Sequence, residues 1–204
     1  MKKIGIMGGT FNPIHMGHLL LAQWAMYFQK LEEIWFIPTG CSYMKENSDN
    51  ITALERLQMT GLAVNNNPFM KVLDLEVKRE GYTYTYETME ELHNRYPEYH
   101  FYFIFGADCL FSIEKWKFPE RIFANCSIIA AVRENCDLSL MKNKIEELRA
   151  QYQADIVLLP FLQLEISSTM IRERVAMGQS IRYLVPDEVI SYIEEKGFYG
   201  YEIK

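Results

Sequence analysis

Short apolar segments alternate with helical patterns over the first 160 residues of the chain. The apolar segments, which we predict to be strands, are Lys3–Met7, Ile34–Pro38, Met70–Val77, Phe101–Phe105, Ser127–Val132 and Ile156–Leu159. Between several of them, apolar residues recur with helical spacing in Gly17–Lys30, Thr52–Asn65, Thr85–Tyr96 and Leu138–Tyr152. Runs that are apolar throughout, such as Phe101–Phe105, are typical of strands covered on both faces. The alternation predicts βαβ units, and therefore an α/β fold with a doubly wound, mainly parallel sheet.

The pattern after residue 160 is helical. One helix is predicted over Ser167–Met177, ended by Gly178, and another over Pro186–Lys196, followed by Gly197. The sequence has no internal repeat and no linker rich in glycine or serine. We therefore expect a single domain over residues 1–204, with residues 165–204 as its small helical C-terminal part. The polar segment Met44–Ile51 lacks periodicity and is predicted to be a loop.

Composition and charge narrow the class of protein. Of the 204 residues, 49% are apolar and 24% charged, as in globular proteins with a substantial core. The net charge of −6 argues against a nucleic-acid partner, whereas a small anionic ligand needs only a local cluster of donors. No apolar stretch is long enough to span a membrane, and glycines interrupt the N-terminal apolar run, so we expect no membrane partner and no signal peptide. The four cysteines show no zinc spacing, which favours reduced thiols and a cytoplasmic location.

The most specific motif is the segment Gly8–His18, which directly follows the first predicted strand. Gly8 and Gly9 permit positive φ and the close approach of a ligand to the backbone. The helix start that follows presents N–H groups and a partial positive charge to anions. His15 and His18 are three residues apart, so they project from the same side of this helix start.

These features predict a phosphate-binding turn. Gly17, between the two histidines, would let a nucleotide lie close. The segment lacks the Gly-Lys-[Ser/Thr] of a Walker loop and the Gly-x-Gly-x-x-Gly fingerprint of dinucleotide-binding proteins. An ordinary βα turn with two surface histidines would not explain this combination of residues. No further ligand supports a metal-binding pair of histidines, so we predict no metal site on the protein.

A second motif, Ile166–Arg172, lies near the other end of the chain. It offers serine and threonine hydroxyls and a guanidinium at another helix start. Together the two motifs predict a site that holds a polyphosphate from both sides.

The residues of both motifs resemble those of a known superfamily. Gly9-Thr10-Phe11-Asn12-Pro13 with His15-Met16-Gly17-His18 is similar to the signature of the His-x-Gly-His nucleotidylyltransferases, and Ile166–Arg172 resembles their second motif. The segments Ser180–Pro186 and Tyr192–Tyr199 resemble the bacterial nicotinate-nucleotide adenylyltransferase branch. This resemblance implies a Rossmann-like nucleotidylyltransferase fold. It also implies adenylyl transfer from ATP to nicotinate mononucleotide, giving nicotinate adenine dinucleotide and pyrophosphate in NAD biosynthesis.

The resemblance also implies which residues act and with which partners. His15, His18 and Arg172 would be catalytic. ATP would be bound by Gly8, Gly9, Thr10, Phe11, Gly17, His18, Gly106, Asp108, Ser167, Ser168, Thr169 and Arg172. The mononucleotide would be bound by Thr10, Lys45, Tyr84, Thr85, Asp108, Trp116 and Arg133. Mg²⁺ would accompany ATP, and the protein would be a monomer or a homodimer.

Several of these residues also have an ordinary structural explanation. Trp116 would stack on the pyridine ring, but it could equally be a core tryptophan. Asp108 could bind ribose hydroxyls or cap the next helix, and Thr85 could likewise be a helix cap. Lys45 and Arg133 could be solvated surface charges.

The chain departs from the family pattern at three places, and rival functions remain. Asn12 replaces a frequent aspartate, Cys41–Met44 replaces a common Pro-Pro-His, and Lys117 stands where an aromatic residue is frequent. One rival is a transferase of the same superfamily that uses nicotinamide mononucleotide or pantetheine phosphate as acceptor. A second rival is an adenylating protein like the class I tRNA synthetases, but the sequence does not contain the Lys-Met-Ser-Lys-Ser element of those enzymes. The third rival is a non-catalytic nucleotide sensor.

Overall fold

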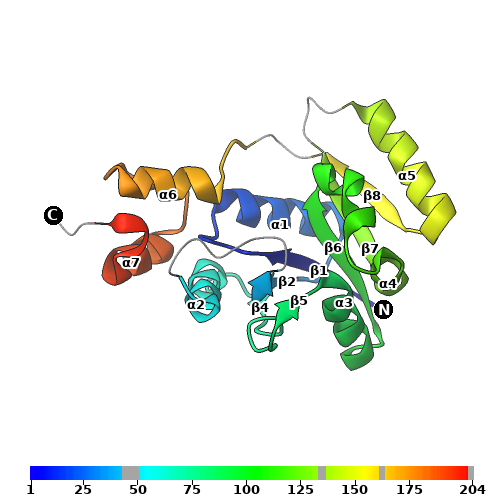
Figure 1. Ribbon diagram of the computed structural model, residues 1–204, viewed down its shortest axis with the longest axis horizontal. Helices are drawn as coiled ribbons and strands as arrows, with labels where there is room; N and C mark the ends of the chain where they lie inside the picture. The colour runs from blue at the N-terminus through cyan, green and yellow to red at the C-terminus, as the bar shows by residue number, and fades with distance from the viewer. Residues whose placement is uncertain (43–50, 133–136, 161–163, 202–204) are drawn as a thin grey trace.

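The computed structural model describes residues 1–42, 51–132, 137–160 and 164–201. Its main sheet has six strands in the order β4-β2-β1-β6-β7-β8, and every neighbouring pair is parallel (Figure 1). The strands are β1 (Lys2–Gly9), β2 (Glu33–Pro38), β4 (Met70–Val72), β6 (Tyr99–Gly106), β7 (Ser127–Val132) and β8 (Ile156–Pro160). The predicted parallel α/β sheet is therefore confirmed.

One predicted strand is too long. We expected it over Met70–Val77, but β4 ends at Val72. The chain turns instead, and the Lys78 N–H donates to the Asp74 carbonyl at 3.0 Å. The polar residues Asp74 and Glu76 interrupt the apolar run, which explains why the strand does not continue.

The predicted helices are present with small shifts at their ends. They are α1 (Met16–Gln29), α2 (Ala53–Val64), α3 (Thr85–Arg95), α5 (Leu138–Tyr152), α6 (Ser168–Ala176) and α7 (Asp187–Lys196). Thr52 caps α2 in a capping box with Glu55, and the Asp137 carboxylate caps α5. Thr85 is not a cap: Tyr84 is the N-cap of α3, and Thr85 is the first helical residue.

The sequence pattern did not predict the shortest elements. They are β3 (Cys41–Ser42), β5 (Tyr82–Thr83), α4 (Pro119–Asn125) and the 3₁₀ helices η1 (Ala107–Phe111), η2 (Ile113–Lys115) and η3 (Phe198–Gly200). The elements of two or three residues are too short to show a hydrophobic period. The strands β3 and β5 form a small parallel pair of their own.

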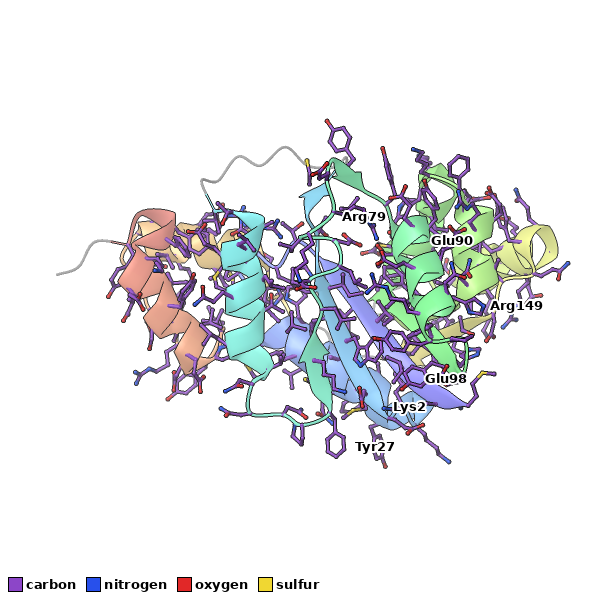
Figure 2. The ribbon with its side chains drawn as sticks, turned by 90° about the horizontal axis from the view of Figure 1, so that it is seen from below. Lys2, Tyr27, Arg79, Glu90, Glu98 and Arg149 are labelled. Atoms are coloured by element: carbon purple, nitrogen blue, oxygen red, sulfur yellow. The ribbon has the colours of Figure 1, made fainter. Side chains whose placement is uncertain are left out.

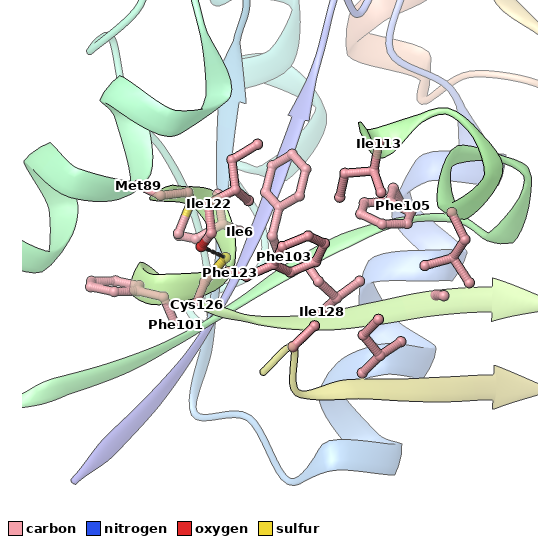
Figure 3. Close-up of a cluster of buried hydrophobic side chains, with 14 of the residues drawn as sticks. Ile6, Met89, Phe101, Phe103, Phe105, Ile113, Ile122, Phe123, Cys126 and Ile128 are labelled. Carbon is pink, nitrogen blue, oxygen red and sulfur yellow. Dashed lines mark hydrogen bonds between the residues drawn. The ribbon is translucent and has the colours of Figure 1, made fainter. Parts of the chain in front are cut away.

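Each face of the sheet carries its own hydrophobic cluster. Alternate residues of a strand point to opposite faces, so Phe101, Phe103 and Phe105 of β6 pack with α3, α4 and α5 (Figure 3). Tyr102 and Ile104 point the other way and join a cluster with α1, α2, α6 and α7. This double coverage explains why β6 is apolar throughout.

The C-terminal helices pack back onto the rest of the protein. Residues of α6 and α7 share the second cluster with the sheet. The Tyr192 hydroxyl on α7 donates to Gln58 Oε1 on α2 at 2.9 Å. This packing is consistent with one domain over residues 1–204. That domain assignment stays a prediction. Among the described residues, every helix is too short or too polar to cross a membrane.

The strand order reverses between β1 and β6. In parallel α/β sheets, the crevice at the carboxyl ends of the two strands at such a point is the usual place for a ligand. Here these ends carry Gly8 and Gly9 on β1 and Gly106 on β6. We therefore expect a ligand site at the two loops that follow these strands.

Candidate active site

The loop between β1 and α1 has an unusual backbone. Phe11 has φ of 49°, although it is not a glycine, and the Asn12–Pro13 peptide is cis. Gly8 and Gly9 do not adopt the positive φ that glycine permits, because the strand β1 runs through both. Close packing explains them better: a Cβ on Gly9 would lie 3.0 Å from the Phe11 ring, and one on Gly8 would lie 3.3 Å from the Phe103 ring.

Side chains from distant segments hold the carbonyl groups of this loop. Arg56 on α2 donates to the Thr10 carbonyl at 2.6 Å. On the other side, the Ser168 hydroxyl donates to the Pro13 carbonyl at 2.9 Å, and Arg172 Nη1 donates to the Asn12 carbonyl at 3.0 Å. The loop is therefore clamped between α2 and α6.

The C-terminal part adds two more contacts to the same loop. The Tyr199 hydroxyl donates to Asn12 Oδ1 at 2.7 Å, and the Met16 N–H donates to the Leu184 carbonyl at 2.8 Å. The two motifs that stand 150 residues apart in the sequence thus form one structure, as expected.

His15 and His18 form a stacked pair at the start of α1. Their ring centroids lie 3.7 Å apart, and the ring of Phe11 meets the ring of His18 edge-on at 5.0 Å. The His15 backbone N–H donates to His18 Nδ1 at 3.2 Å. Because Nδ1 accepts this hydrogen bond, the proton of a neutral His18 resides on Nε2, which is therefore a donor.

Both imidazoles are neutral at pH 7. Burial lowers the pKa of His15 to about 4. Burial, together with the nearby His15, lowers the pKa of His18 to about 3. His15 Nδ1 is buried and is the one such side-chain atom, among the described residues, without a hydrogen-bond partner. The neutral His18 ring, with its donor at Nε2, is thus stacked on a His15 ring whose buried Nδ1 lacks a hydrogen-bond partner.

Gly17 has a packing role within the protein. The prediction that its missing side chain gives room to a nucleotide stays a prediction. A Cβ at this position would lie 3.0 Å from His15 Nδ1 and 3.8 Å from Ile166 Cβ. The glycine therefore makes room for the His15 ring and for the approach of the second motif.

The start of α6 faces the first motif. The Ser167 hydroxyl accepts from the Met170 N–H and so caps the helix, while Thr169 is exposed. Ser168 and Arg172 project to the β1–α1 loop, as their hydrogen bonds show. The predicted ATP residues of both motifs are thus brought together, although no ligand contact is tested for any of them.

The end of β6 lies beside the end of β1 in the sheet. Gly106 is exposed and has open space where a Cβ would be, and Asp108 is exposed in the first turn of η1. Asp108 is not the helix cap that we considered, because the N-cap of η1 is Gly106. Its carboxylate thus remains at the surface beside the strand ends.

Trp116 lies between the end of β6 and the start of α3. It is partly exposed and packs against Phe103 and Phe105 of β6, with centroid distances of 6.3 and 6.1 Å. The next residue, Lys117, places its ammonium 4.1 Å from the ring centroid of Tyr84, the N-cap of α3. The end of β6 and the start of α3 therefore bring together Trp116, Tyr84 and Thr85.

Two predicted mononucleotide ligands, Lys45 and Arg133, lie outside the described residues. Within the described residues, no group of three or more His, Cys, Asp or Glu side chains could hold a metal ion.

Sequence reasoning missed a buried charged group beside the site. Arg56 is 2% exposed, and besides Thr10 it donates to the carbonyls of Thr39 and Gly40. Glu76 is also buried; burial raises its pKa, and the Thr88 hydroxyl donates to it at 2.7 Å. A signal for Arg56 existed, because it is three and four residues before Met59 and Thr60 on the buried stripe of α2.

Comparison with known proteins decides the family. The cytidylyltransferase-like family matches residues 6–174. A "Probable nicotinate-nucleotide adenylyltransferase" of Lachnoclostridium phytofermentans is 49% identical over 98% of this chain and 100% of its own length. The chain belongs to the nicotinate-nucleotide adenylyltransferase family. It is therefore a nucleotidyltransferase, and the resemblance seen in the sequence is confirmed.

Other relatives agree with this assignment. The family member from Oceanobacillus iheyensis is 40% identical over 98% of each chain. The Plasmodium falciparum nicotinic acid mononucleotide adenylyltransferase, solved in complex with NaAD, is 23% identical and matches the whole of both chains with a TM-score of 0.78. This structural match shows that the two proteins share a fold.

Proposed function

We propose that the protein transfers the adenylyl group of ATP to nicotinate mononucleotide. An oxygen of the acceptor's 5′-phosphate attacks the α-phosphorus of ATP, the bond to the bridging oxygen of the β-phosphate breaks, and pyrophosphate leaves with nicotinate adenine dinucleotide as the product. The main observation in support of the proposal is that Ser168 and Arg172 at the start of α6 donate hydrogen bonds to the β1–α1 loop.

The proposed chemistry depends on positioning and charge stabilisation. The acceptor phosphate is already an anion, so the reaction needs no strong base and no covalent intermediate. His18 donates its Nε2–H to an oxygen of the α-phosphate, where negative charge develops. The stacked His15 fixes the orientation of the His18 ring.

In this proposal, the first motif and the start of α6 both bind ATP. Gly8 and Gly9 at the end of β1, Gly17 and the start of α1 take the inner phosphates, and the start of α6 takes the β- and γ-phosphates through Ser168, Thr169 and Arg172. Because the described residues offer no metal cage, Mg²⁺ enters as part of the substrate MgATP, bound by phosphate oxygens and water.

The acceptor is proposed to lie at the other end of the crevice. Trp116 offers a partly exposed indole for stacking on the pyridine ring, and the start of α3 at Tyr84 and Thr85 receives the carboxylate. Asp108 is placed to accept hydrogen bonds from ribose hydroxyls. Lys45 and Arg133 are proposed to bind the phosphate by resemblance alone.

A single acceptor panel tests the reaction. Purified protein and MgATP are incubated with nicotinate mononucleotide, nicotinamide mononucleotide or pantetheine phosphate, and pyrophosphate and the coupled product are quantified. The proposal expects the highest kcat/KM with nicotinate mononucleotide. A preference for another acceptor would contradict it, and ATP binding without pyrophosphate release would indicate the nucleotide sensor.

We further propose a cytoplasmic location for this activity. Three of the four cysteines, Cys41, Cys109 and Cys126, are free thiols in the structure. The fourth, Cys136, lies outside the described residues. Free thiols are typical of a reducing compartment.

A further inference from the structure

Three cationic side chains, those of Arg79, Lys117 and Arg121, lie around the start of α3. Arg79 belongs to the segment between β4 and β5, Lys117 follows η2, and Arg121 lies on α4. Arg79 Nη1 donates to Thr88 Oγ1 on α3 at 3.2 Å, and the Arg121 guanidinium lies 4.3 Å from the ring centroid of Tyr86. The charges of these three groups therefore act on the same end of α3.

Carboxylates of α3 balance two of these cations. Arg79 Nη2 lies 2.5 Å from Glu91 Oε2, and its Nη1 lies 3.7 Å from Glu87 Oε2. Arg121 pairs with Glu90 through two hydrogen bonds, one from Nε and one from Nη2. Figure 2 labels Arg79 and Glu90 in this part of the molecule. Neither guanidinium is left with an unbalanced charge.

Lys117 differs from both arginines. Among the residues that the structure describes, its ammonium forms no ion pair. It lies instead 4.1 Å from the ring centroid of Tyr84 and 5.8 Å from that of Phe118. These cation–π contacts hold the ammonium beside the N-cap of α3, but they do not cancel its charge. The ammonium is therefore available to an anionic group of a ligand.

The first turn of α3 adds to the field of this ammonium. The N-cap residue Tyr84 makes no side-chain hydrogen bond to the turn that follows it. The N–H groups of a first helical turn carry a partial positive charge. The helix start and the Lys117 ammonium therefore attract charge of the same sign.

Lys117 also directly follows the indole to which we assign the pyridine ring. Trp116 packs against Phe103 and Phe105 of β6. Two residues after Lys117, Pro119 is the first residue of α4. The segment that carries Trp116 and Lys117 is therefore anchored by the sheet on one side and by a helix on the other.

We propose that Lys117 selects the acid form of the acceptor, nicotinate mononucleotide, over its amide form. This inference rests on the proposed function, in which the pyridine ring stacks on Trp116 and its carboxylate lies at the start of α3. The ammonium attracts this carboxylate, whereas the amide of nicotinamide mononucleotide has no net charge to attract. Lys117 is thus a specificity-determining residue for adenylyl transfer.

The ratio of the kcat/KM values for nicotinate mononucleotide and nicotinamide mononucleotide, measured at saturating MgATP, tests the proposal. Lys117→Gln removes the charge and is expected to lower this ratio roughly tenfold, mainly by raising the KM for the acid. Lys117→Arg keeps the charge and is expected to restore most of the ratio. The matched control is Lys115→Gln, the same change at an exposed lysine two residues earlier, which is expected to keep the wild-type ratio.

Ionic strength gives a readout that a purely structural role of Lys117 would not change. Salt at about 0.5 M screens exposed charges. Both acceptors carry the same phosphate, so its salt dependence cancels in the ratio. The acid-to-amide ratio of the wild type is therefore expected to fall with added salt, and that of Lys117→Gln to change less.

The outcomes separate this inference from the proposed function. An acid preference that Lys117→Gln leaves unchanged would overturn the inference alone. Equal losses for both acceptors would also overturn it, because the ammonium would then act on a group that they share, such as the phosphate. An equal fall of the ratio in Lys115→Gln would indicate a general effect of net charge and would overturn it as well. A wild type that converts neither mononucleotide would contradict the proposed function, and this inference with it.

Discussion

The hydrogen bond between the His15 N–H and His18 Nδ1 determines how His18 can act. It assigns the donor to Nε2, and the low pKa of His18, about 3, keeps the ring neutral at pH 7. A neutral imidazole with a fixed donor suits a reaction that stabilises developing charge but moves no proton from the acceptor. The spacing of the two histidines was visible in the sequence, whereas the tautomer depends on a backbone contact that no pattern shows.

Removing the His18 ring should therefore slow the chemical step. His18→Ala is expected to lower kcat by about 10²–10⁴-fold, because a donor to the transition state is lost. Steady-state kinetics with MgATP and nicotinate mononucleotide measures this. The control is His93→Ala on the exposed face of α3, and a kcat for His18→Ala equal to that of this control would contradict the assigned role.

The same two rings predict a pH dependence of stability. Unfolded histidines have a pKa near 6.5, whereas burial lowers the folded values to about 4 for His15 and about 3 for His18. Between pH 6.5 and 4 the unfolded state binds more protons, so the free energy of unfolding must fall as the pH falls. The double variant His15→Ala/His18→Ala is expected to show a smaller fall in urea titrations across this range. An equal fall in both proteins would contradict the low folded pKa values.

Helix α2 supports the β1–α1 loop through one buried side chain. Its residue Arg56 donates to three carbonyls: Thr10 before α1, and Thr39 and Gly40 after β2. A buried guanidinium with several acceptors holds these two loops at a fixed distance. These hydrogen bonds explain how the β1–α1 loop keeps its shape.

Arg56→Met is expected to destabilise the protein by about 3–5 kcal/mol, because the buried carbonyl groups lose their donor. Urea unfolding at pH 7 measures the change. Arg95→Met, at the exposed end of α3, serves as the matched control. Equal free energies of unfolding for the two variants would show that the hydrogen bonds of Arg56 do not stabilise the fold.

The reliability of the sequence-based predictions depended on element length. β6 and β7 were located correctly because their apolar runs are continuous, and α5 because its period persists over 15 residues. The pair β3 and β5 has two residues in each strand, so no period could reveal it. Gly8 and Gly9 permit positive φ, but in this loop it is Phe11 that adopts it, which no residue pattern indicates.

At the scale of the molecule, the C-terminal part closes the site. α6 and the segment around Tyr199 bind the β1–α1 loop, and α7 packs on α2. The residues of the two motifs predicted a common polyphosphate site before any resemblance was considered. Their actual contacts, from side chains to loop carbonyls, required the structure.

This arrangement predicts that the chain unfolds as one unit. The second hydrophobic cluster joins Val189 and Ile193 of α7 to Ile34 and Ile104 of the sheet. Urea unfolding followed by far-UV circular dichroism and by tryptophan fluorescence should give coincident transitions. Two separate transitions would show that residues 165–204 form an independent unit.

The central claim is that both ends of the chain bind the same triphosphate. A crystal structure with MgATP in which a methylene group replaces the α,β-bridging oxygen tests it most directly. The account predicts an α-phosphate oxygen within hydrogen-bond distance of His18 Nε2 and the terminal phosphates at the start of α6 near Arg172. A triphosphate that contacts only one of these two segments, or that binds elsewhere, would contradict it.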